Sequence, residues 1–190
     1  MTRLLAIALL LASSLPLPQA AANPVKSLYT TVDLKTCKKF KRNRERGAWQ
    51  CQGLAGIPVY VAEGDLRQFV SAGAHADKRR AANQTLGAYN SIFGLGSNRA
   101  VVEWRFERRG EKQLPYAIIV RFHTSNDLRA GAVLVVLKVD ERETCHVAYI
   151  DALANEDAIT LARFIADGKA RSFDCRREPI AEGALGRSPM

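Results

Sequence analysis

The sequence has few of the residues, and none of the spacings, on which metal sites usually depend. Its 190 residues include three histidines, His75, His123 and His146, and four cysteines. No His-x-His, His-Glu-x-x-His or Cys-x-x-Cys spacing occurs, and these are the spacings that bring zinc ligands together. The sequence therefore predicts no metal site.

Motifs for nucleotide binding and for nucleophilic catalysis are also missing. Gly94-Leu95-Gly96 has neither the preceding strand nor the third glycine of a dinucleotide-binding turn. Ser71, Ser91 and Ser125 do not lie in a nucleophile elbow, and Glu63-Gly64-Asp65 is typical of an ordinary turn. We therefore expect no cofactor and no assignable catalytic residue.

Long apolar runs are absent after residue 22, so the sequence predicts no transmembrane segment in the rest of the chain. Before that point, Arg3 precedes nine apolar residues, Leu4 to Ala12, and small residues end the segment at Ala22. This order is typical of a secretory signal peptide. We expect residues 1–22 to be removed before Asn23 and the product to be periplasmic or extracellular.

The four cysteines, Cys37, Cys51, Cys145 and Cys175, all follow this leader. An even number in an exported chain predicts two disulfides, for which three pairings exist. Cys37 and Cys51 flank a short polar stretch that reads as a hairpin tip, and joining them places Lys39 opposite Trp49.

The second pair follows from lengths. A strand from Cys145 to Asp151 is roughly 20–23 Å long, and a helix over 156–171 is about 24 Å long. A helix that folds back along this strand returns the chain to the start of the strand, so Cys175 arrives beside Cys145. The predicted disulfides are therefore Cys37–Cys51 and Cys145–Cys175.

Alternating apolar and polar residues predict eight strands, which turn residues separate. They are Thr36–Arg42, Ala48–Gln52, Pro58–Ala62, Leu66–Ser71, Val101–Arg109, Tyr116–Thr124, Ala132–Val139 and Cys145–Asp151. The short spacing favours antiparallel pairing. Ala132–Val139 is apolar throughout, which predicts a strand that is covered on both faces.

One long helix is expected near the end, over Glu156–Arg171, with Asn155 as its cap and an apolar stripe from Ala158 to Ile165. Residues 74–99 form a polar connection with a helical turn or two near 78–86, and 176–190 lose the pattern and predict a loose tail. The fold class is α+β. A single antiparallel, strand-rich domain over 23–175 carries a C-terminal helix packed on its sheet.

The strongest charge feature is the segment Lys38–Arg46, which we call the basic hairpin. Its six cations outnumber its single acid, Glu45, and give a net charge of +5 of the +8 that remains after removal of the leader. They are Lys38, Lys39, Lys41, Arg42, Arg44 and Arg46. One interpretation is a projecting finger, with Phe40 and Trp49 adjacent, that contacts a polyanion. The other is a solvated edge whose like charges discourage aggregation.

Two histidines raise the question of catalysis. His146 adjoins Cys145, but neighbouring side chains of a strand point to opposite faces and a disulfide removes the thiol. One hypothesis is that His123 acts as a general base, oriented by Glu103 or Glu107 of the preceding strand. The alternative is a cross-strand ladder of charges on a half-exposed sheet.

Three segments carry a resemblance: Gly56–Arg67, Cys145–Ala152 and the ending Ala162–Arg176 with its Phe173-Asp174-Cys175. Over most of residues 30–177 the chain resembles a family of small exported Gram-negative bacterial proteins without a characterised function. The resemblance implies secretion and paired cysteines, and it implies no activity or ligand.

These observations favour a non-catalytic binding or envelope-associated protein whose basic hairpin contacts an anionic envelope component or a protein partner. Nucleic acid is not expected, because an exported protein seldom meets it and no recognition motif accompanies the charge. The alternative is a proteinaceous inhibitor of an envelope hydrolase. A small hydrolase that uses His123 is the third hypothesis.

Overall fold

The computed structural model describes residues 26–40 and 47–190, which form two sheets and one α-helix. The large sheet has the order β1-β7-β8-β9-β10-β11, and the short strand β6 (Tyr89–Ser91) also pairs with β8. Its other strands are β1 (Lys26–Asp33), β7 (Arg99–Arg109), β8 (Lys112–Ser125), β9 (Ala130–Val139), β10 (Thr144–Asp151) and β11 (Ile180–Glu182). The small sheet has the order β2-β3-β4-β5. Its strands are β2 (Lys38–Lys39), β3 (Ala48–Gln52), β4 (Pro58–Gly64) and β5 (Arg67–Ala72).

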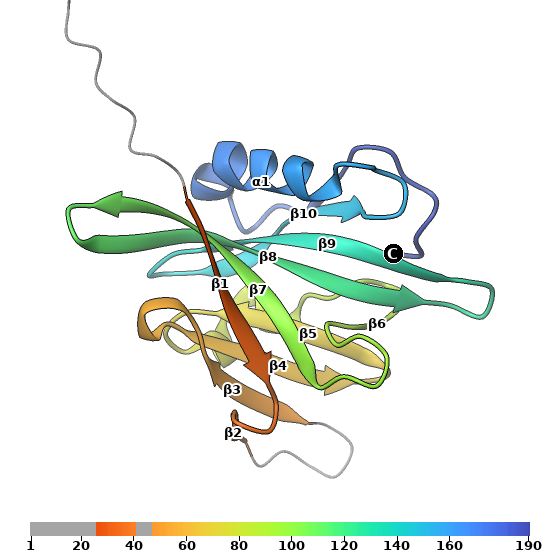
Figure 1. Cartoon of the computed structure of the whole chain (residues 1–190), viewed down its shortest axis with the longest axis horizontal. Coiled ribbons are helices and arrows are strands. Elements are labelled where there is room, and N and C mark those ends of the chain that lie inside the picture. Colours follow the sequence, from red (N-terminus) through yellow and green to blue (C-terminus); the bar gives the residue numbers. More distant parts are fainter. Residues whose placement is uncertain (1–25, 41–46) are drawn as a thin grey trace, which may run out of the picture.

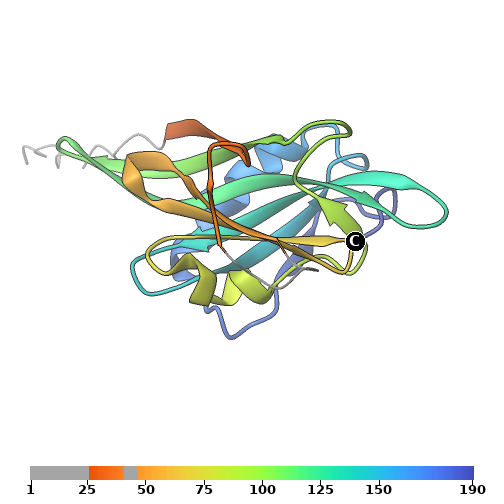
Figure 2. The same ribbon diagram turned by 90° about the horizontal axis from the view of Figure 1, so that it is seen from below.

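The elements form three layers (Figure 1). Helix α1 (Ala158–Lys169) covers one face of the large sheet over β9 and β10, and the small sheet lies against the other face. Figure 2 shows the small sheet from below, with the strands of the large sheet behind it. Every strand pair is antiparallel except β10 with β11. The α+β, mostly antiparallel architecture with its helix on the sheet is confirmed.

The main core lies between the two sheets and follows from strand alternation. Val59 and Val61 of β4, and Trp104 of β7, point into this layer and are fully buried. Alternate residues of β8 (Ile118, Val120 and Phe122) meet them from the other side. Each such side chain stabilises the fold by roughly 1.5–3 kcal/mol through burial of apolar surface.

Strand β9 is buried on both faces, as its uninterrupted apolar sequence predicts. Val133 and Val135 point into the core between the sheets, whereas Leu134 and Val136 face α1. The helix presents Ala158, Ala162, Ile165 and Ala166 to this second core. Small residues on α1 let it approach the sheet closely.

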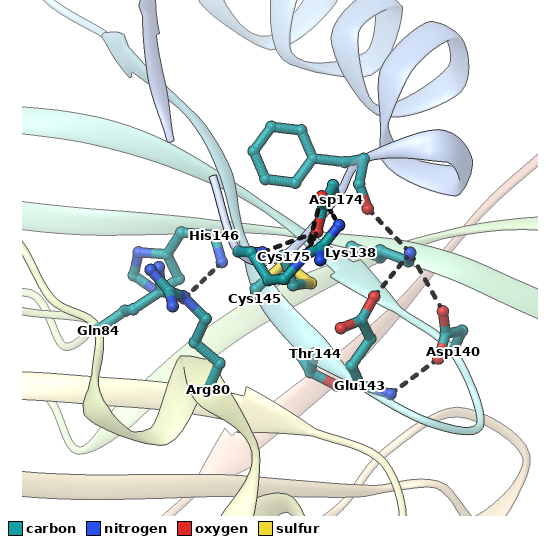
Figure 3. Close-up of a disulfide and its surroundings, with 12 residues drawn as sticks. Arg80, Gln84, Lys138, Asp140, Glu143, Thr144, Cys145, His146, Asp174 and Cys175 are labelled. Carbon is teal, nitrogen blue, oxygen red and sulfur yellow. Dashed lines mark hydrogen bonds and ion pairs between the residues drawn. A yellow bond between two sulfur atoms is a disulfide. The ribbon is translucent and has the colours of Figure 1, made fainter. Parts of the chain in front are cut away.

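Both predicted disulfides are present. Cys37 and Cys51 join β3 to the segment that leads into β2, with a Cα–Cα distance of 4.4 Å. Cys145 and Cys175 join β10 to the chain that follows α1, at 5.7 Å. Figure 3 shows this second bridge beside Lys138, whose Nζ lies 3.1 Å from Glu143 Oε1 and 3.0 Å from the Phe173 carbonyl oxygen.

The helix differs from the prediction at its start. It begins at Ala158 rather than Glu156 and is followed by a 3-10 turn, η4 (Ala170–Ser172). Asp157 occupies the N-cap position, and Asn155 does not cap the helix. The Asn155 side chain instead donates to the Asp151 and Ala184 carbonyl oxygens, 2.8 and 2.7 Å away. A contact with a distant segment has replaced the local cap.

The prediction of a loose tail over 176–190 is wrong. Residues 180–182 form β11, which pairs in parallel with β10. Further on, Ser188 is 3% exposed, and its hydroxyl lies 2.6 Å from a carboxylate oxygen of Asp151. Asp151 is buried, and its carboxylate also accepts from the backbone N–H groups of Arg187 and Ser188, at 2.7 and 2.8 Å. A buried carboxylate therefore holds the end of the chain.

Some shorter elements also differ. Strand β1 was not predicted, and the strand expected over Thr36–Arg42 is limited to β2 among the described residues. The connection 74–99 contains η2 (Ala76–Lys78), η3 (Arg80–Asn83) and β6. A further 3-10 turn, η1 (Leu54–Gly56), precedes β4.

Candidate functional site

The described part of the basic hairpin lies on the edge strand of the small sheet. Lys38 and Lys39 form β2 and are both exposed. The other four cations, Lys41, Arg42, Arg44 and Arg46, lie outside the described residues. The structure therefore shows the base of the hairpin and how that base is attached.

Covalent and aromatic contacts anchor this base. Lys39 pairs with Trp49, as predicted, and its ammonium lies 5.7 Å from the centre of the Trp49 ring. This distance is within the range of a cation–π contact. Phe40 packs edge-on against Tyr60 at 6.2 Å between ring centres. With the Cys37–Cys51 bridge beside them, these contacts hold the two lysines on a rigid support.

A cleft of about 780 Å³ lies at the end of the molecule where β5, β6 and β8 meet, and we call it the β6 cleft. Its rim includes three exposed apolar side chains, Leu66, Tyr89 and Leu95, with exposed fractions of 73, 41 and 108%. The backbone of Leu66 has a φ of +57°, a conformation that is rare for a large side chain. An N–H group of β6, that of Asn90, donates to the Leu66 carbonyl oxygen at 3.1 Å and supports this turn.

The structure places His123 in the β6 cleft and not beside Glu103 or Glu107. On β8, Ile119 lies opposite Glu103, so His123 is four residues, or about 13 Å, further along the strand. Strand partners of His123 are Ser91 and Ala132. The two acids that share the cleft with it are Glu63 of β4 and Asp65 of the β4–β5 turn. Sequence reasoning missed this proximity because it joins segments about 60 residues apart.

Glu103 and Arg105 belong to a buried ion network that fastens α1 to the large sheet. Arg163 of α1 donates to Glu103 at 2.7 Å. Arg105 donates two bonds to Asp167 of α1, at 2.9 and 2.7 Å. Both β7 residues are less than 10% exposed. The charge ladder expected on this face is thus largely covered by the helix.

Tyr116 completes this network. Its hydroxyl donates to Asp167 at 2.6 Å, and the Arg171 guanidinium lies 3.5 Å from the centre of its ring. Burial, with the neighbouring Asp167 carboxylate, raises the pKa of Tyr116 to about 12. The phenol therefore stays protonated at neutral pH and acts as a hydrogen-bond donor.

His146 is fully buried next to the Cys145–Cys175 bridge (Figure 3). Its backbone N–H donates to the Gln84 side chain at 2.9 Å, and its Nδ1 lies 3.0 Å from the Tyr149 hydroxyl. Burial lowers the pKa of His146 to about 3. The ring is neutral at physiological pH, and the disulfide leaves no thiol beside it.

Over residues 26–40 and 47–190 no group of three or more His, Cys, Asp or Glu side chains is arranged to hold a metal ion. Within the same ranges no helix is long and apolar enough to cross a membrane. Two disulfides are consistent with a secreted or periplasmic protein.

Comparison with known proteins found no match to a family model, to a curated protein or to a solved structure.

Proposed function

We propose that the protein is an exported, non-catalytic binding module that contacts an anionic envelope component through the basic hairpin. The observation that carries the proposal is the placement of Lys38 and Lys39 on an exposed edge strand, next to the four further cations of residues 41–46. The Cys37–Cys51 disulfide and the contacts with the Trp49 and Tyr60 rings fix the position of β2. Rigid presentation lowers the entropy lost when a partner binds.

Export is part of the same proposal. We propose that residues 1–22 are removed before Asn23, and the two disulfides support passage into an oxidising compartment. Mass spectrometry of protein from its natural host tests this step. A product that begins at Asn23 without free thiols is expected, and a full-length product with reactive thiols would refute export.

Binding is tested with vesicles of phosphatidylglycerol and phosphatidylcholine. Replacement of Lys41, Arg42 and Arg44 by Gln is expected to weaken binding on the order of 100-fold, since each cation near an anionic surface contributes about 1 kcal/mol. Three exposed cations of the large sheet, Arg108, Lys112 and Arg121, give a control with the same change in net charge.

Binding should also weaken steeply as salt is added. Equal losses in the two triple variants, or binding that does not respond to ionic strength, would remove the hairpin from the proposal.

The rim of the β6 cleft favours a second candidate, an inhibitor of an envelope hydrolase. Leu66 and Leu95 are exposed on short turns, where a partner's groove can accept them. A stable one-to-one complex with a purified envelope hydrolase, lost in Leu66→Ser, would favour this function. Unchanged activity across a panel of such hydrolases would count against it.

A further inference from the structure

A second basic surface lies away from the hairpin, where the connection after β5 meets the β9–β10 turn. A pocket of about 510 Å³ opens there between η2, η3 and that turn. Four cations, one histidine and one acid line it: Lys78, Arg79, Arg80, Arg142, His75 and Glu143.

Two backbone carbonyl groups hold the Arg79 side chain in position. Its Nε donates to the Ala74 carbonyl oxygen at 3.0 Å, and its Nη2 donates to the Glu141 carbonyl oxygen at 2.7 Å. Both of these acceptors are neutral backbone groups. Arg67, Arg99 and Arg105, in contrast, each form an ion pair with an aspartate. Among residues 26–40 and 47–190 no carboxylate forms an ion pair with Arg79, so its guanidinium brings a positive charge to the wall of the pocket.

The carboxylates near the pocket offset only part of its charge. Glu143 is paired with Lys138 at 3.1 Å, and Glu178 accepts a bond from Arg80 at 3.0 Å. Lys78 and Arg142 are exposed, and so are the neighbouring acids Asp77 and Glu141. Four cations therefore line a pocket whose one acidic lining residue, Glu143, already forms an ion pair with Lys138.

The backbone at the edge of the pocket has an uncommon conformation. His75 has a φ of +53°, in the left-handed region that favours glycine. Such residues cost of order 1 kcal/mol or more and gather at ligand sites. This turn starts η2 and leads directly to Lys78 and Arg79.

The pocket and the base of the basic hairpin lie on one side of the small sheet. Ala76 of η2 and Phe40 of the hairpin base both pack on its outer face, around Tyr60 and Ala62. A single extended polyanion that lies along this face can therefore reach both the pocket and the base of the hairpin.

We propose that this pocket binds a phosphate group. Arg79 and Arg142 provide planar guanidinium donors and Lys78 an ammonium, the groups that proteins use for tetrahedral oxyanions. The inference rests on the proposed function for its biological ligand, because it specifies that the anionic component carries phosphate. The site itself does not need the hairpin.

Inorganic pyrophosphate is the probe, titrated calorimetrically into the mature protein at constant ionic strength. We expect saturable binding to one site that sulfate and chloride do not reproduce at equal ionic strength. Lys78→Gln with Arg142→Gln is expected to weaken it roughly tenfold or more, since each removes one charge-assisted contact. Because both side chains are exposed, the variant should fold, which circular dichroism verifies.

Lys38→Gln with Lys39→Gln is the matched control and is expected to bind pyrophosphate as the wild type does. No saturable binding, or equal weakening in the two double variants, would overturn the proposal. Arg79→Lys adds a second test, because it keeps the charge but loses the guanidinium plane, and unchanged binding in this variant would remove Arg79 from the site.

Phosphatidylglycerol vesicles distinguish the source of the phosphate. If vesicle-bound protein no longer takes up pyrophosphate, the lipid phosphate occupies the pocket, and simultaneous binding indicates a soluble phosphate. Vesicle binding that fails in the hairpin variant while pyrophosphate binding persists supports both proposals. Pyrophosphate binding without any vesicle binding refutes only the hairpin's membrane partner.

Discussion

Gln68 donates a hydrogen bond to Asn90 across the junction of the two sheets. The backbone N–H of Gln68 in β5 donates to the Asn90 side-chain oxygen at 3.0 Å, and the Gln68 side-chain oxygen accepts from the Ile92 N–H at 2.8 Å. Both side chains are less than 10% exposed. Because β6 pairs with β8, these two hydrogen bonds join the small sheet to the large sheet without a continuous strand ladder.

Asn90→Ala is expected to lower the free energy of unfolding by about 1–3 kcal/mol, because the Gln68 N–H loses its partner in a buried position. Urea unfolding followed by tryptophan fluorescence measures the change. Asn98→Ala, at an exposed position, is the control and should leave the urea midpoint in place. An equal midpoint for both variants would mean that the sheets hold together without this pair.

The Asp151 carboxylate accepts five hydrogen bonds, three of which come from the C-terminal segment. The donors are the N–H groups of Leu153, Ala154, Arg187 and Ser188 and the Ser188 hydroxyl. Burial by itself would raise the pKa of Asp151, but these donors outweigh it and lower the pKa.

Asp151→Ala is therefore expected to destabilise the protein by on the order of 3 kcal/mol and to speed amide exchange over residues 180–190. Hydrogen exchange with mass spectrometry gives the local readout, and the exposed Asp127→Ala is the control. If residues 180–190 stay protected in the Asp151 variant, other contacts hold this segment.

His146 is expected to make the protein less stable in mild acid. The folded-state pKa of about 3 lies below the unfolded value of 6.5, so the unfolded chain binds the proton first. The free energy of unfolding should fall by about 2 kcal/mol between pH 7 and pH 5 from this residue. Asp140 and Asp151, whose pKa values are lowered from 3.8, contribute losses only at lower pH.

Urea unfolding at a series of pH values tests this expectation through the slope of the free energy of unfolding against pH. His146→Phe should flatten the slope above pH 5. Tyr149→Phe, which removes the ring's hydroxyl partner but keeps the imidazole, should retain it. The same slope in His146→Phe as in the wild type would assign the acid sensitivity to another group.

Arg105 is one of two β7 residues, with Glu103, that bind α1 through ion pairs. Arg105→Met is expected to cost about 3 kcal/mol, because Asp167 loses a two-bond partner in a site where Arg105 is only 7% exposed. Faster amide exchange in α1 should accompany the loss. The exposed pair of Arg176 and Asp174 has similar geometry, and Arg176→Met should leave the unfolding midpoint unchanged.

Hydrophobic periodicity predicted the strands that are buried on at least one face, and it missed β1 and β11, the edge strands of the large sheet. The alternation of Trp104 and Phe106 marks β7, and the apolar run of β9 marks a central strand. Strand β1 was missed because Leu28 and Tyr29 are exposed and Val32 is its one buried residue with a described side chain. An exposed edge strand pairs through its backbone, which leaves little signal in its side chains.

Features that depend on near neighbours could be predicted from the amino-acid sequence: the buried strands, the helix, the two cysteine pairs and the concentration of charge in Lys38–Arg46. The pairing of distant polar groups could not, because it depends on how the sheets pack. Examples are Asp151 with Ser188, Gln68 with Asn90, and Arg79 with the Glu141 carbonyl. These partners lie 22 to 62 residues apart. Local propensity and periodicity carry no information on such pairs, because they form only once the packed sheets bring them within a hydrogen-bond length.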